Sequence, residues 1–398
     1  MLHRPFVIRV AVLTLLLAFS RGASAQVVPD TGRAPRGTSW TFTSAGMRLV
    51  ATVVTDDITV PFGLTFLPDG RALATDRTKA RLLIVSASGA VREVKGVPAV
   101  NSVEDGGLLD VQLDPAFRAD GRIYYTFTED SAGSSWLAVE RARLVKDSLV
   151  ERTRLYTAKP AIARGTQHGG RMIVDGDDLY IALGDHGPRE QAQDLRSPWG
   201  KVLRLKRDGS VPEDNPFVGN AAALPEIWSV GHRNPHGFVK HPVTGALWEV
   251  EHGPKGGDEV NIIVRGANYG WPVITYGREY KGPLINDGLE VKEGMEQPVY
   301  YWVPSIAPGG AAFYYSSVLA GWKGNLFVGA LAKRHLSRLE FRDGRMVLEE
   351  KLFLGREWRV RAVAAAPDGS LWFGVDGSEV NGVKQHGMLV RVTRAKSR

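Results

Sequence analysis

The 398-residue sequence contains no cysteine, which excludes disulfides, thiolate metal sites and cysteine nucleophiles. Its formal net charge is +7, but no run of lysine or arginine indicates nucleic-acid binding, so we expect no nucleic-acid partner. By length alone the chain could form two or three domains, but no Pro/Ser/Gly-rich or charged linker divides it, which favours one large domain.

The first 25 residues have the layout of a secretory signal peptide. Arg4 and Arg9 precede an apolar run from Val10 to Phe19, and a small-residue ASA sequence ends at Ala25. This run is too short to span a bilayer stably, and we expect no membrane span in the mature chain. Removing the segment takes away three arginines and no acidic residue, which lowers the formal charge from +7 to +4. We therefore expect a periplasmic or secreted protein.

Short β-rich runs separated by turns follow, and amphipathic helical periods are scarce. Residues 26–43 are poorly patterned, and we expect an irregular N-terminal segment there. After it, one theme recurs six times: an apolar strand, a turn rich in Pro, Asp and Gly, and a second strand that ends near a charged or aromatic residue. The copies are residues 61–77, 106–130, 169–185, 235–253, 320–341 and 360–377.

The spacing of the copies fits four-stranded blades with insertions, because propeller blades repeat at about 40 to 50 residues. A β-sandwich is the alternative, but sandwiches do not usually repeat one strand-turn-strand unit six times. The sequence therefore predicts an all-β fold, a six-bladed β-propeller with four-stranded antiparallel blades, which forms a single catalytic domain over residues 44–398. Residues at the ends of the inner strands would face one mouth of a central channel.

His168 lies in the sequence GTQHGGRM just before one predicted strand, and Asp185 ends the next strand in ALGDHG. A loop histidine can be a packed structural residue, a metal ligand or a base that takes a proton from a substrate. Its ordinary pKa near 6.5 suits a general base at neutral pH when a carboxylate orients the ring. In a hairpin, Asp185 could supply that carboxylate, and the residues alone leave the three interpretations open.

Eight motifs occur in one order along the chain: GTQHGGRM, ALGDHG, WGKVLRL, DNPF, GHRNPHGF, EVEHGPKGGDEVN, NYGWP and WRVRAVAAAPDGSLW. In this order they resemble the soluble glucose/sorbosone dehydrogenases that depend on pyrroloquinoline quinone (PQQ), and the chain is most similar to their aldose sugar dehydrogenase branch. The resemblance covers residues 52–392. It implies an enzyme that oxidises the C1 hydroxyl of aldose sugars to lactones and passes two electrons to calcium-bound PQQ, then to an external acceptor.

The resemblance also assigns catalytic roles. His168 matches the base that deprotonates the C1 hydroxyl as hydride leaves, with Asp185 as its orienting partner. Arg233 in GHRNPHGF matches the arginine beside the reactive quinone carbonyl, where a fixed guanidinium stabilises developing negative charge, and Asn234 is expected near the cofactor. From the residues alone, a loop held by an arginine salt bridge is the alternative.

Two calcium sites are implied around the EHGPKGGDEVN motif. The carbonyl groups of Gly253 and Pro254 match ligands of the catalytic calcium, and carbonyl oxygens are ligands that this cation accepts. Glu259 and the Tyr269 carbonyl match ligands of a second, structural calcium. A Gly/Asp-rich surface turn without metal is the alternative.

Three cations complete the implied cofactor site. Arg359 and Arg361 are two residues apart in a predicted strand, so their side chains share one face, as suits groups that bind carboxylates. PQQ is a tricarboxylate, and the resemblance implies that Lys333, Arg359 and Arg361 bind it, with a hydroxyl contact from Ser305. In the cofactor-free protein we expect both arginines to be unpaired and to add no stability.

Two positions depart from the glucose-oxidising relatives. Asp105 stands where they carry a substrate-contacting glutamine, and His252 replaces a glutamine beside the calcium loop, at the cofactor. The preferred sugar therefore stays open. Two other functions also stay open: a calcium-dependent lactonase-type hydrolase, which would surround a central metal with carboxylate and amide groups, and a non-enzymatic ligand-binding propeller, in which His168 or the arginine pair would be replaced.

Overall fold

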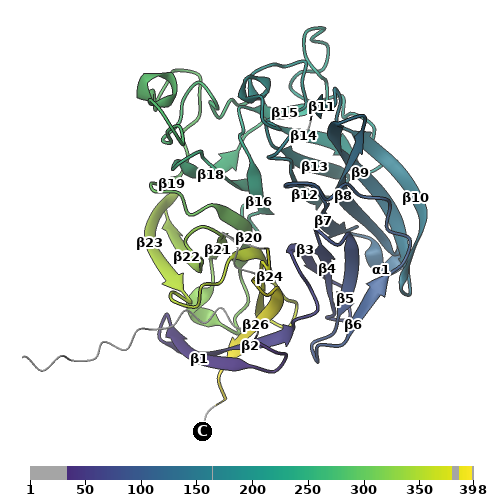
Figure 1. Ribbon diagram of the computed structural model, residues 1–398, viewed down its shortest axis with the longest axis vertical. Coiled ribbons are helices and arrows are strands. Elements are labelled where there is room, and N and C mark those ends of the chain that lie inside the picture. Colours follow the sequence, from purple (N-terminus) through teal and green to yellow (C-terminus); the bar gives the residue numbers. More distant parts are fainter. Residues whose placement is uncertain (1–33, 164, 379–384, 397–398) are drawn as a thin grey trace, which may run out of the picture.

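The computed structural model describes residues 34–163, 165–378 and 385–396. Six small antiparallel sheets stand in a ring, which confirms the predicted six-bladed β-propeller (Figure 1). The predicted signal peptide, residues 1–25, lies outside the described residues. Within them, no helix is both long and apolar enough to cross a membrane.

Five blades each consist of consecutive strands. The first is β3 (Pro61–Phe66), β4 (Ala72–Asp76), β5 (Arg81–Val85) and β6 (Val91–Val94); the second is β7 (Leu108–Leu113), β8 (Arg122–Ser131), β9 (Ser134–Val145) and β10 (Ser148–Thr157), with β11 (Ile162–Ala163) beside β9. The third is β12 (Gly169–Asp175), β13 (Asp178–Leu183), β14 (Lys201–Lys206) and β15 (Ile227–Val230).

The fourth blade is β16 (Pro235–Lys240), β17 (Leu247–Glu251), β18 (Asp258–Ile263) and β19 (Tyr300–Trp302); the fifth is β20 (Pro308–Tyr314), β21 (Asn325–Ala330), β22 (His335–Arg342) and β23 (Arg345–Leu352). Helical structure is confined to short pieces: α1 (Phe117–Asp120) and the 3₁₀ turns Arg189–Ala192, Ile285–Gly288 and Ala320–Trp322.

The sixth blade joins the two ends of the chain and closes the ring. Its inner strands β24 (Val360–Ala365), β25 (Leu371–Val375) and β26 (Met388–Arg394) are followed outward by β2 (Met47–Thr55) and β1 (Ser39–Ser44), so purple and yellow strands lie side by side in Figure 1. The expectation of an irregular segment up to residue 43 was therefore wrong from Ser39 onward. Strand β1 forms because β2 offers it a free edge.

The innermost strands β3, β7, β12, β16, β20 and β24 contact one another around the axis. Each pairs with the second strand of its blade through a register shift near its beginning. Such bulges bend a strand and redirect its side chains. Glycines allow the close approach of neighbouring blades, since a Cβ on Gly237 would lie 2.8 Å from the Ala311 Cβ and one on Gly63 would lie 2.8 Å from the Val111 nitrogen.

One of the six predicted copies is displaced by a strand. Five copies coincide with the innermost pair of their blade, but residues 320–341 cover β21 and β22, the second and third strands of the fifth blade. The innermost strand there, β20, contains two adjacent glycines, Gly309 and Gly310, and a Cβ on either would press against Arg361. The residues of β20 are chosen by packing against the neighbouring blade, and they show no alternation of buried and exposed side chains.

Candidate active site

His168, Arg233 and Arg359 lie at the end of the ring where the innermost strands β12, β16 and β24 begin. At the other end, a cavity of about 360 Å³ is lined by residues of every innermost strand. The buried Arg171 side chain lies across the axis and donates to the carbonyls of Phe62 and His236 at 2.8 and 2.7 Å. It also contacts the Arg361 carbonyl at 3.4 Å, so it links its own blade to three others beneath the site.

Arg359 and Arg361 are not unpaired, which corrects the expectation from the sequence. Both Nε and Nη2 of Arg361 lie 2.6 Å from Oδ2 of Asp376, which is fully buried, and Arg359 Nη2 is 3.9 Å from the same oxygen. Burial alone would raise the pKa of Asp376, but the charges of Arg361 and Arg359 and the hydrogen bonds from Ser378 together outweigh it and bring the pKa down to about 2. The arginine pair therefore has a structural partner.

The Asp376 ion pair predicts a loss of stability in acid. A carboxyl whose folded pKa is about 2 instead of the ordinary 3.8 stabilises the fold fully above 3.8 and loses that contribution as pH falls toward 2. We expect the free energy of unfolding of the wild type to fall across this window, and Asp376→Asn to show a shallower fall. Urea unfolding at successive pH values measures it; identical slopes would contradict the assignment.

A fourth arginine, Arg77, was missed in the sequence. It follows β4 and is 6% exposed, and burial together with the nearby Arg361 charge lowers its pKa to about 10. Its Nη1 is 3.8 Å from Asp105 Oδ1. Burial alone would raise the pKa of Asp105, but the charges of Arg77 and Arg361 lower it. The predicted substrate residue is therefore an ionised carboxylate.

His168 is buried beside these charges. Its ring lies 4.3 Å from that of His186, and its Nδ1 has no hydrogen-bond partner among the described residues. Burial first, then the neighbouring His186, lowers the pKa of His168 to about 3, which keeps the ring neutral at pH 7. The side chain also lines a small cavity of about 30 Å³ with Asn101 and Ser135.

Asp185 does not orient the His168 ring: among the described residues no hydrogen bond joins the two. Asp185 accepts a hydrogen bond from Trp271 Nε1 at 2.8 Å. It also accepts one from the Gln167 amide nitrogen, and the Gln167 oxygen in turn accepts from Arg233 Nη2 at 2.7 Å. The register between the two strands keeps Asp185 away from the ring, because the backbone nitrogen of Gly184, and not that of Asp185, donates to the His168 carbonyl. The carboxylate whose charge acts on His168 is Asp105.

Arg233 is held against the predicted calcium loop. Its Nη1 donates to the carbonyls of His252 and Gly253 at 2.9 and 2.8 Å, and its Nε is buried without a partner among the described residues. A Cβ on Gly253 would collide with the Gly256 and Gly257 carbonyls, so only glycine fits there. Nearby, the Asn234 side-chain oxygen is also buried and has no hydrogen-bond partner in the part of the chain that the structure describes.

Other predicted residues have structural partners as well. His252 Nε2 lies 2.5 Å from the Pro308 carbonyl, and burial lowers its pKa to about 4. Ser305 donates to Asp258, which also accepts from the backbone of Gly253 and Ile306 and so ties two loops together.

Of the two residues predicted for the structural calcium, Tyr269 is buried and Glu259 is half-buried. Glu259 lies opposite Glu251 on neighbouring strands, whereas the Tyr269 ring stacks on His232 at 4.8 Å. The Tyr269 hydroxyl donates to the Ile262 carbonyl at 2.5 Å, so its side chain has a packing role separate from that of its carbonyl.

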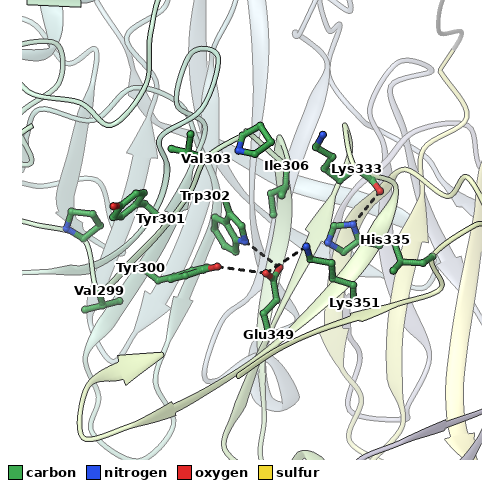
Figure 2. Close-up of a pocket in the computed structure, with 13 residues that line it drawn as sticks. Val299, Tyr300, Tyr301, Trp302, Val303, Ile306, Lys333, His335, Glu349 and Lys351 are labelled. Carbon is green, nitrogen blue, oxygen red and sulfur yellow. Dashed lines mark hydrogen bonds and ion pairs between the residues drawn. The ribbon is translucent and has the colours of Figure 1, made fainter. Parts of the chain in front are cut away.

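Lys333 lines a groove between the fourth and fifth blades. This cavity of about 780 Å³ is lined by β19 and by residues of β22 and β23 (Figure 2). Glu349 in it already accepts from Trp302 Nε1 at 3.1 Å and from Ser337 at 2.8 Å. Arg359 Nη1 donates to the Leu331 carbonyl at 3.1 Å, which connects the arginines to the turn that carries Lys333.

Comparison with known proteins decides the family. Residues 58–385 match the Glucose / Sorbosone dehydrogenase family. The chain belongs to the glucose/sorbosone dehydrogenase family. An aldose sugar dehydrogenase of Escherichia coli is 38% identical over 332 residues, which cover 82% of this chain and 90% of that relative.

Solved structures of glucose/sorbosone dehydrogenase type share the fold. The apo-form of the soluble aldose sugar dehydrogenase from Escherichia coli has a TM-score of 0.82 at 36% identity, covering 87% of this chain and 100% of that one. The PQQ-bound form of the Streptomyces coelicolor aldose sugar dehydrogenase has a TM-score of 0.69 at 25% identity, covering 90% and 100%.

Sequence reasoning about this dehydrogenase overlooked Arg77, Gln167, Trp271 and Asp376. A usable signal existed for two of them: Arg77 and Asp376 directly follow the second strand of their blades, the position at which the repeated theme places charged residues. Gln167 and Trp271 carry no such signal, because their roles depend on contacts with Asp185.

Proposed function

We propose that this protein is a PQQ-dependent aldose sugar dehydrogenase that oxidises the C1 hydroxyl of the sugar to a lactone. The observation that carries the proposal is the excess of positive charge beside a neutral histidine. Among the described residues, Arg77, Arg233, Arg359 and Arg361 surround the mouth, where Asp105 and Asp376 are the carboxyl groups with a lowered pKa. The family and the PQQ-bound relative support the same cofactor.

The residues present fit an acidic cofactor. The buried Nε atoms of Arg77, Arg233 and Arg359 have no partner in the described structure, so each can donate one more hydrogen bond. A tricarboxylate such as PQQ supplies acceptors for these donors, with Lys333 and the Asn234 amide as further contacts. The permanent charge of an arginine suits this task because its guanidinium stays protonated even when buried.

Calcium fits the loop that faces Arg233. The Gly253 carbonyl is turned toward the guanidinium, which shows that it offers a lone pair to a positive group, and we propose that Gly253 and Pro254 hold the cation there. When bound, PQQ supplies an electron-poor quinone carbonyl that accepts hydride, and calcium polarises that carbonyl as a Lewis acid. Glu259 and the Tyr269 carbonyl are proposed for the structural calcium.

His168 acts as the general base in this proposal. Its neutral ring accepts the proton of the C1 hydroxyl while the C1 hydrogen leaves with its electron pair, so the C1–O bond becomes the lactone carbonyl. The ionised Asp105 nearby favours the imidazolium that forms and can accept a second sugar hydroxyl. Arg233 stabilises negative charge that develops on the cofactor, and Asp185 positions Arg233 through Gln167.

Reconstitution tests the proposal. We expect purified cofactor-free protein to reduce a redox dye with aldoses only when both PQQ and calcium are added, and a chelator to release the quinone, because the cation and the arginines hold it together. A panel of aldoses then identifies the preferred sugar. Full turnover in a preparation shown to lack PQQ would contradict the proposal, and lactone hydrolysis without PQQ would favour the lactonase alternative.

A further inference from the structure

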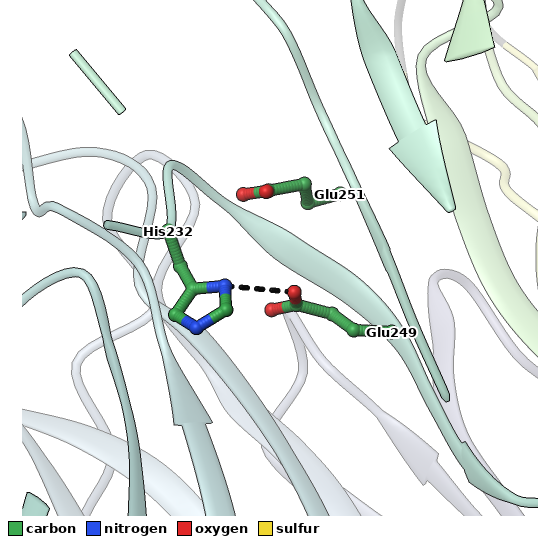
Figure 3. Close-up of side chains that lie close together, drawn as sticks. All are labelled: His232, Glu249 and Glu251. Atoms are coloured by element: carbon green, nitrogen blue, oxygen red, sulfur yellow. Dashed lines mark ion pairs between the residues drawn. The ribbon is translucent and has the colours of Figure 1, made fainter. Parts of the chain in front are cut away.

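Three buried side chains with metal-binding groups meet beside the turn that carries Arg233 (Figure 3). His232 comes from the loop between β15 and β16, whereas Glu249 and Glu251 lie two residues apart on β17 and share one face of the sheet. His232 and Glu249 are fully buried, and Glu251 is 4% exposed. One ligand atom from each of the three lies within 4.8 Å of the others.

The Glu249 carboxylate lacks a hydrogen bond at either oxygen among the described residues. His232 Nδ1 is 2.8 Å from Glu249 Oε2 without hydrogen-bond geometry, while its Nε2 lies 2.8 Å from the Ser229 hydroxyl. When Nε2 carries the ring hydrogen, a nitrogen lone pair and carboxylate lone pairs face one another. Lone pairs at this separation in a buried site require a cation or a proton between them.

Negative charge is only partly compensated around these residues: the charge of the buried Lys201 acts on His232, but Lys201 donates to backbone carbonyls and forms no ion pair with the carboxyl groups among the described residues. On the neighbouring strand β18, Glu259 lies opposite Glu251 and Asn261 lies opposite Glu249, so three carboxyl groups share this face. No lysine or arginine of the described chain forms an ion pair with Glu249, Glu251 or Glu259, and the Asn261 amide oxygen is buried without a partner.

We propose that His232, Glu249 and Glu251 bind a divalent first-row transition cation such as Zn²⁺ or Mn²⁺. One imidazole nitrogen with two carboxylates suits these cations, whereas calcium prefers oxygen ligands alone. Ligand bonds of about 2.0 to 2.2 Å place two ligands at most about 4.4 Å apart, so the present spacing needs only small side-chain shifts. The site shares no ligand with the two calcium sites proposed above, and Glu259 and Tyr269 lie directly beside it.

The cation would stiffen the catalytic turn. Glu251 Oε2 accepts hydrogen bonds from the backbone nitrogens of Arg233 and Asn234 at 2.5 and 3.3 Å. His232 is the residue directly before them, so a cation on His232 and Glu251 holds both sides of the turn. Strand β17 then continues into the His252 and Gly253 carbonyls that contact Arg233. These three ligands are therefore positioning residues for Arg233.

Metal analysis of the full chain without PQQ tests the proposal. After chelation, we expect one equivalent of Zn²⁺ or Mn²⁺ to rebind in excess calcium and to raise the melting temperature. Glu249→Gln keeps the shape of the side chain and should weaken this binding at least about 100-fold, since even outer partners of a metal ligand contribute 10- to 100-fold. Glu226→Gln is the matched control and should retain it, because this buried carboxyl group precedes β15, accepts from the Tyr156 hydroxyl and lies outside the proposed sites.

A spectroscopic measurement covers the case in which Glu249→Gln does not fold. Mn²⁺ bound to the wild type should show magnetic coupling to one histidine nitrogen, and His232→Asn should abolish that coupling. Three results would overturn the proposal: no transition cation bound by the wild type, binding that Glu249→Gln leaves unchanged, or bound Mn²⁺ without nitrogen coupling. The first would indicate that His232 and Glu249 share a proton instead.

Discussion

His168→Ala is expected to bind PQQ as the wild type does and to lose turnover by about 10² to 10⁴-fold, the usual contribution of a general base. The histidine acts on the sugar hydroxyl and has no hydrogen bond from Nδ1 to any described residue, so its removal leaves the arginines in place. PQQ affinity by fluorescence quenching and dye-linked turnover with a saturating aldose measure the two quantities separately.

His241→Gln is the control for this experiment. His241 lies in the turn between β16 and β17, at the opposite end of the blade from Arg233, and its Nε2 is 3.0 Å from the Tyr315 hydroxyl. We expect it to retain turnover. Loss of PQQ binding in a folded His168→Ala protein would show that the histidine is a cofactor ligand, and unchanged turnover would exclude it as the base.

Arg361→Ala is expected to destabilise the cofactor-free protein by about 3 to 5 kcal/mol, because it leaves the fully buried Asp376 carboxylate without its main partner. Arg359→Ala should cost much less, since Arg359 is 3.9 Å from Asp376 and its side chain is 18% exposed. Urea unfolding without PQQ compares the two variants, which differ by two positions on one strand.

Both arginine variants should weaken PQQ binding. A charge-assisted hydrogen bond to a buried partner is worth about 1.5 to 3 kcal/mol, or roughly a ten- to hundred-fold rise in the dissociation constant. The double variant Arg361→Met with Asp376→Asn removes both charges and should recover much of the lost stability without recovering PQQ affinity. Equal stability of the Arg359→Ala and Arg361→Ala proteins would contradict the pairing seen here, and unchanged PQQ affinity would remove the arginines from the cofactor site.

The sequence by itself determined the repeated inner strands, the motifs and the end of the ring at which they meet. These features are local: a blade repeats its turn residues and its alternation, and His168, Arg233 and Arg359 all stand where an innermost strand begins. Residues at equivalent positions of repeated blades share one mouth whatever the detailed packing. The family resemblance then supplied chemistry for that mouth.

Only the tertiary structure decided which side chains pair within the mouth. Asp185 meets Gln167 and Trp271 rather than His168 because a bulge shifts the register of β12 against β13. Asp376 neutralises Arg361, and β1 completes the last blade, through contacts between segments distant in sequence. Periodicity reports the face on which a residue lies, but its partner depends on strand register and on how neighbouring blades pack, and neither is encoded in a local pattern.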